Sequence, residues 1–207
     1  MTRLLDLAPR ALERLRGAEL VEAIGASEGR TIAAETITAT GPLLDRVSNP
    51  ELVAAFGADI IVLNLYDVDH PRIAGMPRRA GDAAPGDDAT AFGAVGTGAG
   101  RTAGDVARWT GRVTAVNLEP VDEAVASFPA GRRATARNAE LLVEQGAAIA
   151  VITGNPGTGV TIEAIERATR AIREATQDRL VLFSGRIHAA ASGQAVMTAQ
   201  DVDRLAR

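Results

Sequence analysis

Residues 145–165 read QGAAIAVITGNPGTGVTIEAI, and this stretch decides the fold class. A glycine at the end of a helical pattern leads into an apolar, β-branched run, and a glycine-rich loop then leads into a second helical pattern. The same helix–Gly–Ala–strand junction occurs at residues 56–61, which read FGADII. Strands that alternate with helices in this way predict an α/β protein with a parallel sheet and right-handed crossovers.

The same alternation extends along the chain on both sides of this stretch. Apolar runs predict five strands, at residues 31–38, 58–65, 112–118, 147–153 and 179–184. Helical spacing and capping signals predict helices at residues 4–23, 49–57, 135–145, 161–176 and 198–207. Residues 67–104 show no sustained period, which predicts a long loop or insertion within a single domain over residues 1–207. Five strands are fewer than the eight of a closed (β/α) barrel. The pattern therefore fits an incomplete TIM-type barrel or, alternatively, an open five-stranded parallel sheet.

The composition bounds the class of protein and its partners. The 207 residues are 46 % hydrophobic and 23 % charged, which is typical of one globular domain. The net charge is −4 and no basic tract is present, so nucleic acid is not an expected partner. No apolar run is long enough to span a membrane, and the N-terminus lacks the apolar core of a secretory signal. We expect a cytoplasmic protein.

Missing residue types exclude several kinds of chemistry. The chain has no cysteine, which excludes thiolate nucleophiles and Cys-ligated metal sites. All 22 basic residues are arginine. Without lysine the chain cannot form a Schiff base, anchor pyridoxal phosphate or build a nucleotide-binding P-loop.

Polar residues follow all five predicted strands. In parallel α/β folds, functional residues collect at the carboxyl ends of the strands, so we predict a site at this end of the sheet. The residues, strand by strand, are Glu35 and Thr38; Asn64, Tyr66, Asp67, Asp69 and His70; Asn117, Glu119 and Asp122; Thr153 and Asn155; and Ser184, Arg186 and His188.

Three of the carboxylates are candidates for holding a metal ion. Mg²⁺ prefers oxygen ligands, and we predict that Glu35, Asp67 and Glu119 place Mg²⁺ or another divalent ion. The alternative is that these are surface acids, a description that suits Asp69 and Asp122 best.

The two histidines are candidates for acid–base chemistry near neutral pH. We predict that His188 is the general acid or base, with a structural loop histidine as the alternative. His70 precedes Pro71 and fits a turn.

The glycine-rich loop after the fourth strand is a candidate anion site. A turn between a strand and a helix directs free backbone N–H groups and the helix dipole toward one point. The predicted anion-binding residues are Thr153, Gly154, Asn155, Gly157, Thr158 and Asn117. The glycine spacing matches no nucleotide-binding motif. The alternative is an elaborate turn in which Thr158 and Thr161 cap the next helix.

Several segments resemble one known family. The sequence resembles a family of bacterial TIM-barrel proteins that are labelled phosphoenolpyruvate-phosphonomutase-like or haloacid-dehalogenase-like. The resemblance implies an eight-stranded barrel with its site at the strand ends listed above. The similar segments are ASEGR (26–30), PLLD (42–45), VSN (47–49), FGADI (56–60), VNLEPVD (116–122), TGNPGTGV (153–160) and IHAA (187–190).

The chain departs from that family in two places. Members of the family continue with a further Gly-Ala-Asp strand, so this chain looks like a barrel that lacks its last strands. The family has Gly-Lys-Met-His where this sequence has Gly185-Arg-Ile-His188. Arginine keeps the charge and can hold an anion, but it cannot act as a base.

Together these observations predict a metal-assisted lyase or isomerase that acts on a small phosphorylated or carboxylated metabolite. The metal would stabilise an enolate-like intermediate. The predicted catalytic residues are His188, Glu119 and Arg186, of which Arg186 would hold the substrate. The alternative is a non-catalytic ligand-binding or scaffold protein, or an inactive barrel fragment. Its exposed sheet edges would be covered by a partner or by a second copy of the chain.

Overall fold

The computed structural model describes residues 2–77, 98–154, 158–185 and 197–206. Five strands form one sheet: β1 (Ala33–Ile37), β2 (Ile60–Asn64), β3 (Val113–Leu118), β4 (Ile149–Ile152) and β5 (Val181–Ser184). Every neighbouring pair is parallel, and the strands lie in sequence order from β1 to β5. Over the described residues, β1 and β5 each pair on one side only, so the sheet is open and does not close into a barrel. The predicted α/β class is confirmed, in the form of the open-sheet alternative.

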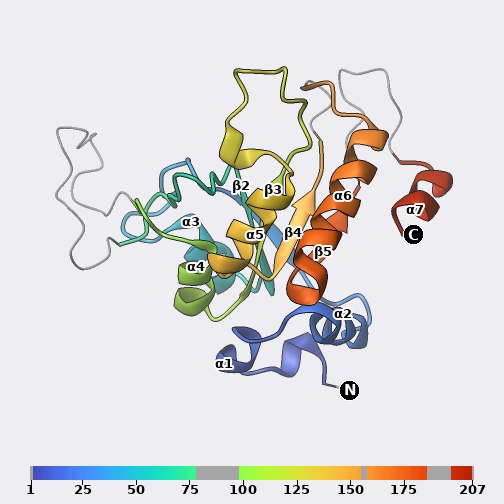
Figure 1. Cartoon of the computed structure of the whole chain (residues 1–207). Coiled ribbons are helices and arrows are strands. Elements are labelled where there is room, and N and C mark those ends of the chain that lie inside the picture. Colours follow the sequence, from blue (N-terminus) through green and yellow to red (C-terminus); the bar gives the residue numbers. More distant parts are fainter. Residues whose placement is uncertain (1, 78–97, 155–157, 186–196, 207) are drawn as a thin grey trace.

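The helices that connect the strands lie on one face of the sheet (Figure 1). They are α3 (Asn49–Ala55), α4 (Ala103–Thr110), α5 (Ala136–Glu144) and α6 (Ile162–Thr176), and α7 (Ala199–Leu205) follows β5 and packs beside α6. They share a face because each strand is added on the same side of the one before it, with crossovers of one hand. Short 3₁₀ turns are found at Leu4–Asp6, Ala130–Arg132 and Gln177–Arg179.

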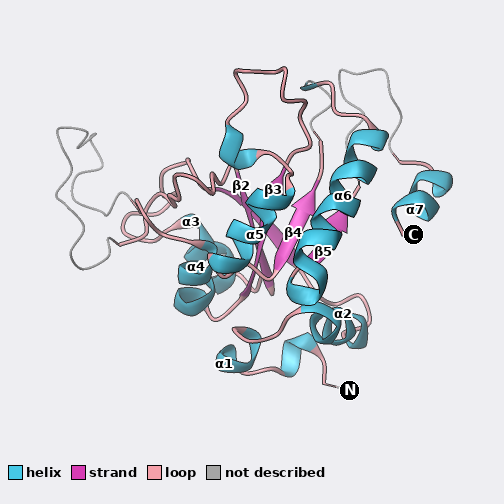
Figure 2. Ribbon diagram, viewed as in Figure 1, coloured by secondary structure: helices cyan, strands magenta, loops and turns pink. Residues whose placement is uncertain are grey.

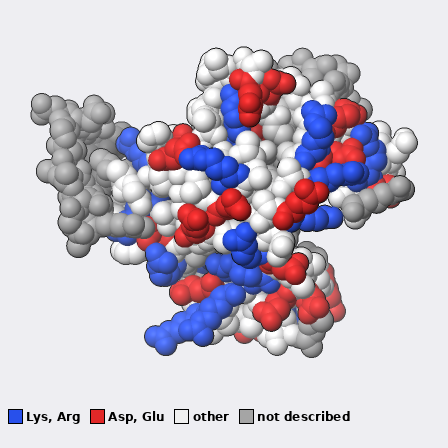
Figure 3. Space-filling view, in the orientation of Figure 1, with Lys and Arg blue, Asp and Glu red and all other residues white. Residues whose placement is uncertain are grey.

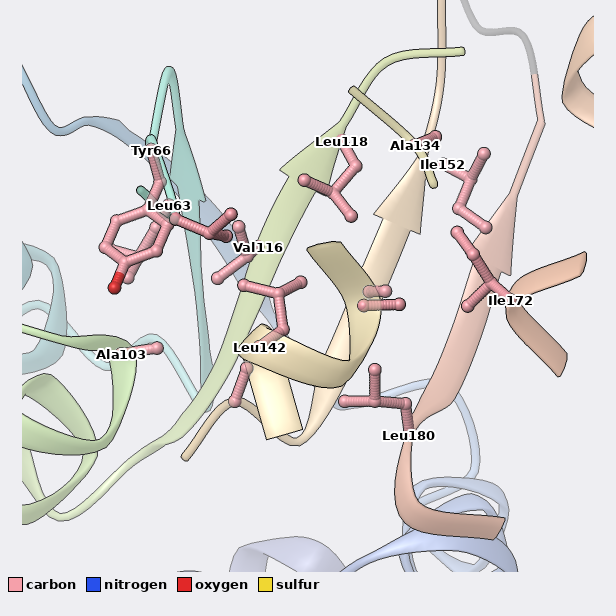
Figure 4. Packing of buried hydrophobic residues seen from close by; sticks show 14 of the residues in the cluster. Leu63, Tyr66, Ala103, Val116, Leu118, Ala134, Leu142, Ile152, Ile172 and Leu180 are labelled. Atoms are coloured by element: carbon pink, nitrogen blue, oxygen red, sulfur yellow. The ribbon is translucent and has the colours of Figure 1, made fainter. Parts of the chain in front are cut away.

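The main hydrophobic core lies between these helices and the sheet (Figure 4). Leu63, Val116 and Ile152 point from the strands toward the helices, where Leu142 of α5 and Ile172 of α6 meet them. All five side chains are fully buried. Because side chains alternate along a strand, the residues between these positions point to the opposite face of the sheet.

The N-terminal segment covers the amino-terminal half of that opposite face. It contains α1 (Pro9–Leu12) and α2 (Gly17–Ala26), which lie at the foot of the view in Figure 2. Its leucines form a second core with the first residues of the strands: Leu4, Leu12 and Leu20 with Ile60, Val113, Ile149 and Val181. The carboxyl-terminal half of this face is therefore the part that the N-terminal segment leaves open.

A half-buried arginine fixes the N-terminal segment to the rest of the fold. Arg16 donates hydrogen bonds to the backbone oxygens of Glu13 and Leu15 and, at 3.3 Å, of Gly146 in the turn before β4. Burial lowers the pKa of its guanidinium below the ordinary value.

The structure differs from the sequence prediction mainly at the helices. The helix predicted over residues 4–23 is three short elements, because Pro9 begins a new helix and Gly17 has φ +48°. The N-cap of α3 is Ser48, which shares a capping box with Glu51. Asn49, the first residue of the predicted helix, hydrogen-bonds backbone groups of residues 40–43.

Helix α4 was not predicted. Thr102 and Asp105 form its capping box, and Gly111 ends it with φ +66°. The helix begins inside the predicted loop of residues 67–104, at its last two positions. Residues 78–97, the middle of that loop, lie outside the described residues.

Among the described helices, none is both long and apolar enough to cross a membrane.

The cap of α6 gives a first testable prediction. The Thr161 hydroxyl accepts a hydrogen bond from the Ala164 amide at 3.2 Å. Thr161→Ala removes this acceptor and is expected to lower the free energy of unfolding by about 1 kcal/mol. For a chain of this size the melting temperature should fall by roughly 2–4 °C. Thr161→Ser keeps the hydroxyl and should melt close to the unaltered protein. Equal melting of all three proteins would show that the cap contributes nothing.

Candidate functional site

A row of hydrogen-bonded side chains crosses four neighbouring strands on the sheet face opposite α3–α6. Thr153 donates its hydroxyl proton to Asn117 Oδ1 at 2.8 Å. Asn117 Nδ2 donates to Asn64 Oδ1 at 3.2 Å, and Asn64 Nδ2 donates to Glu35 Oε1 at 3.1 Å. We call Glu35, Asn64, Asn117 and Thr153 the polar row. It joins the middle of β1 to the carboxyl ends of β2, β3 and β4.

The direction of these hydrogen bonds is fixed by two groups on either side of the Asn64 amide, one that donates and one that accepts. The Leu65 backbone N–H donates to Asn64 Oδ1 at 2.7 Å, and a backbone N–H can only donate. On the other side of the Asn64 amide, a carboxylate oxygen of Glu35 accepts from Asn64 Nδ2. These two contacts set the amide of Asn64, which in turn sets Asn117 and then Thr153. Leu65 itself has φ +58°, in the left-handed region that non-glycine residues rarely adopt.

Apolar side chains lie next to the polar row, one step nearer the amino ends on the same face. They are Val62, Ala115, Val151 and Phe183, at alternate positions of β2 to β5. Ala115 is fully buried, and the other three are half-buried against the second core. Glu35 is exposed, Asn64 and Thr153 are half-buried, and Asn117 is 8 % exposed. The row thus borders an apolar surface and opens to solvent at its Glu35 end.

Glu119 lies two residues beyond Asn117 and is also buried, at 8 % exposed. Its Oε1 accepts a hydrogen bond from Arg132 Nη2 at 3.3 Å. Its Oε2 is buried and has no hydrogen-bond partner within the described part of the chain. Arg132 in turn lies over the Phe128 ring, 4.9 Å from its centroid. The sequence placed Glu119 at this end of the sheet but did not identify its arginine partner.

The loop between β3 and α5 is held by a buried arginine, Arg133, which was not predicted from the sequence. Its guanidinium donates to four backbone oxygens of that loop at 2.7–3.1 Å, those of Val121, Asp122, Val125 and Phe128. The loop lies at the carboxyl ends of the strands, at the top of Figure 1. Arg133 therefore gives a defined shape to one border of the site.

The three predicted metal ligands do not come together. Asp67 Oδ1 accepts from the backbone amides of Asp69 and His70 and closes a turn, and its side chain lies against Gly131. Glu35 belongs to the polar row, and Glu119 pairs with Arg132. Within the residues that the structure describes, no three His, Asp or Glu side chains are grouped as a metal site would require. The arrangement does not fit a divalent ion held by this set.

Other strand-end residues have structural partners. His70 is exposed in the turn that Asp67 closes, and Asp69 pairs with Arg137 at 2.8 Å. Asp122 accepts from the Ala124 amide at 2.8 Å. Two further residues belong to the helix side of the sheet: the Tyr66 hydroxyl donates to Gln145, and Ser184 hydrogen-bonds Thr169 of α6.

The glycine-rich loop is described only at its ends. A Cβ at Gly154 would collide with the Val160 side chain, so these two described ends of the loop lie against each other. Thr161 caps α6, as the structural alternative predicted. Four predicted site residues, Asn155, Gly157, Arg186 and His188, lie outside the described residues, and the anion-binding role of the loop stays a prediction.

Surface charge on the helix side of the sheet does not mark a second site. Figure 3 shows arginines and carboxylates interspersed over the described part of this face. Arg204 of α7, for example, pairs with Glu166 at 2.6 Å and with Glu163 at 3.3 Å. The pKa of Glu163 is lowered mainly by a hydrogen bond from its own backbone amide. Hydrogen bonds from Thr161 and Arg204 lower it further.

Comparison with known proteins places the chain in a family. The sequence matches the family described as a domain of unknown function, DUF7916, over residues 5–207. The chain belongs to this family. The matched region of DUF7916 contains all five strands, the polar row and Arg133. No curated protein matches the chain.

Proposed function

We propose that the polar row binds a small carboxylated or phosphorylated metabolite and that the protein acts on it as a lyase or isomerase. The observation that carries this proposal is the alignment of Asn64 and Asn117. Each asparagine uses one amide hydrogen within the row, and neither amide nitrogen has a second acceptor among the described residues. The second amide hydrogen of each is therefore available to an oxygen of the ligand.

These amide donors can do more than bind. When a proton leaves the carbon next to a carboxylate or carbonyl, negative charge builds on the oxygen, and fixed donors stabilise that charge. In this proposal Asn64 and Asn117 hold the oxygen, His188 moves the proton and Arg186 holds the second anionic group. The resemblance to phosphoenolpyruvate-phosphonomutase-like proteins supports the class of reaction. Because the predicted metal ligands do not come together, no step is assigned to a metal.

Asn117→Leu tests the proposal. Leucine has the same branching and the same number of side-chain heavy atoms as asparagine but offers no N–H, so affinity for a bound acid is expected to fall at least tenfold. Binding can be followed by NMR titration with malate, 3-phosphoglycerate and phosphoenolpyruvate.

The matched control for that test is Thr114→Val on the same strand. The Thr114 hydroxyl is buried and has no hydrogen-bond partner in the described residues, so its removal should leave both folding and binding unchanged. If Asn117→Leu binds these acids as well as Thr114→Val does, the row is not the binding site.

A scaffold function is the second candidate. Two observations favour it: β1 and β5 form sheet edges in the described structure, and Val62, Val151 and Phe183 are only partly covered. An unpaired edge and a partly apolar face are surfaces that a second copy of the chain could cover. Sedimentation velocity tests this directly, since a monomer at micromolar concentration would argue against it.

A further inference from the structure

We infer that the polar row selects acids that carry a hydrogen-bond donor on the carbon next to the carboxylate, which are 2-hydroxy or 2-amino acids. This inference rests on the proposed function of the row and narrows its ligand. It follows from the direction of the hydrogen bonds in the row, which determines where the row has a free donor or a free acceptor.

The four side chains present a defined sequence of donors and acceptors. Glu35 has one carboxylate oxygen that makes no hydrogen bond in the described structure. Asn64 and Asn117 each have one free amide hydrogen, because each amide nitrogen carries two hydrogens and donates only one within the described structure. Their oxygens already accept from Leu65 or from neighbours in the row. The row thus offers two adjacent donors beside one acceptor that carries charge when ionised.

A carboxylate without a neighbouring donor matches only part of this pattern. Its oxygens can accept from the two asparagines, but Glu35 then faces a second negative group across one strand spacing, with no proton between them. Like charges at this distance repel. A hydroxyl or ammonium group placed between them donates to Glu35 and removes the conflict.

The spacing of the row sets where that donor must be. Asn64 Nδ2 donates to Glu35 Oε1 at 3.1 Å, so the remaining hydrogen of Asn64 and the remaining oxygen of Glu35 lie beside each other, and the ligand groups that meet them must be close together. A carboxylate at carbon 1 and a donor at carbon 2 satisfy this requirement. A 2-oxo acid has an acceptor at carbon 2 instead and leaves Glu35 unsatisfied. The apolar side chains next to the row, Val62 and Val151, can contact the carbon chain of the ligand.

Four compounds with the same three-carbon skeleton separate these requirements. Propionate has only the carboxylate, lactate adds a hydroxyl, alanine adds an ammonium, and lactamide keeps the hydroxyl but has no carboxylate. Each is titrated into the full chain, and the side-chain amide NMR signals of Asn64 and Asn117 are followed, since ligands of this size bind weakly. Lactate and alanine are expected to bind about tenfold more tightly than propionate, and lactamide at least tenfold more weakly than lactate.

Glu35→Gln identifies the residue responsible. The amide keeps an acceptor for Asn64 but loses the charge, so the advantage of alanine over propionate should fall to about threefold or less. Glu22→Gln, at an exposed position of α2, is the matched control and should keep the full advantage.

Each other outcome would overturn the inference. Equal binding of propionate, lactate and alanine, or lactamide that binds as well as lactate, would refute the selectivity and leave the proposed acid-binding role of the row standing. The same holds if Glu35→Gln keeps the full preference. If no carboxylate shifts the Asn117 signals, the inference and the proposed function both fail.

Discussion

Replacing Arg133 with methionine is expected to lower the free energy of unfolding by about 2–4 kcal/mol. The substitution removes four hydrogen bonds from a charged donor, each of which contributes roughly 1.5 kcal/mol or more when it is buried. Part of the loss is recovered, because Asp122 and Val125 are exposed and their backbone oxygens can bind water instead. The melting temperature should fall by roughly 4–16 °C.

The effect should be local as well as global. Hydrogen exchange of the backbone amides of residues 121–128 is expected to become faster in Arg133→Met under native conditions, because the loop loses the group that holds it. Arg170→Met is the matched control: Arg170 is exposed on α6 and makes an ion pair with Glu166 one turn away. Its change should stay within about 0.5 kcal/mol. A loop that exchanges equally slowly in both variants would contradict the role of Arg133.

The second large effect is expected for Leu142→Ala, at about 3–4 kcal/mol. Leu142 is fully buried on α5 and faces β3 and β4 in the main core (Figure 4). Removing its side chain loses the transfer free energy of the buried carbons and leaves a cavity that close-packed neighbours refill only in part. Denaturant unfolding should show a lower midpoint with an unchanged slope.

Leu142→Met is the control for that result. It keeps the volume and apolar character of the site and should lose less than about 1.5 kcal/mol. If the alanine variant is no less stable than the methionine variant, α5 does not pack on the sheet as described. Because β3 and β4 carry Asn117 and Thr153, the alanine variant should also bind acids more weakly.

The order of elements was predictable, because it depends on local signals. All five strands lie where continuous apolar runs predicted them, and α5 and α6 begin directly after Thr135 and Thr161, their N-caps. The missing helix, α4, directly follows a stretch rich in glycine and alanine that shows no sustained period. Its signal was the pair Thr102 and Asp105, a capping box with aspartate in place of the usual glutamate.

The sequence predicted at which end of the sheet the site lies, but not how its side chains are connected. Asn117 and Thr153 were predicted as anion-binding residues and Glu35 as a metal ligand, while Asn64 had no assigned role. What links the four is that each points to the same sheet face, which follows from strand register. Register depends on long-range pairing, such as that of Leu63 with Val116, and it cannot be counted along the chain. The sequence signal for the shared face was that Asn64 and Asn117 each lie at an even spacing from strand residues of that face, namely Val62 and Ala115.

The side-chain partners of the carboxylates were not predictable. Asp67 is used in a turn because the residues after it fold back onto its oxygen, and Glu119 is paired because the loop after β3 returns Arg132 to it. Both depend on loop conformations for which the sequence carries no periodic signal. Arg133 was missed for the same reason, since a buried arginine that binds only backbone oxygens leaves no acidic partner to find.

The left-handed backbone at Leu65 has a consequence for how the protein meets its ligand. In the described structure the Leu65 amide donates to Asn64 Oδ1, so a half-turn of the Asn64 amide would leave that N–H unsatisfied. A half-turn of the Asn117 amide would place its oxygen against the oxygen of Asn64. The donors and acceptors of the site are therefore fixed before a ligand binds, and the protein needs little reorganisation on binding.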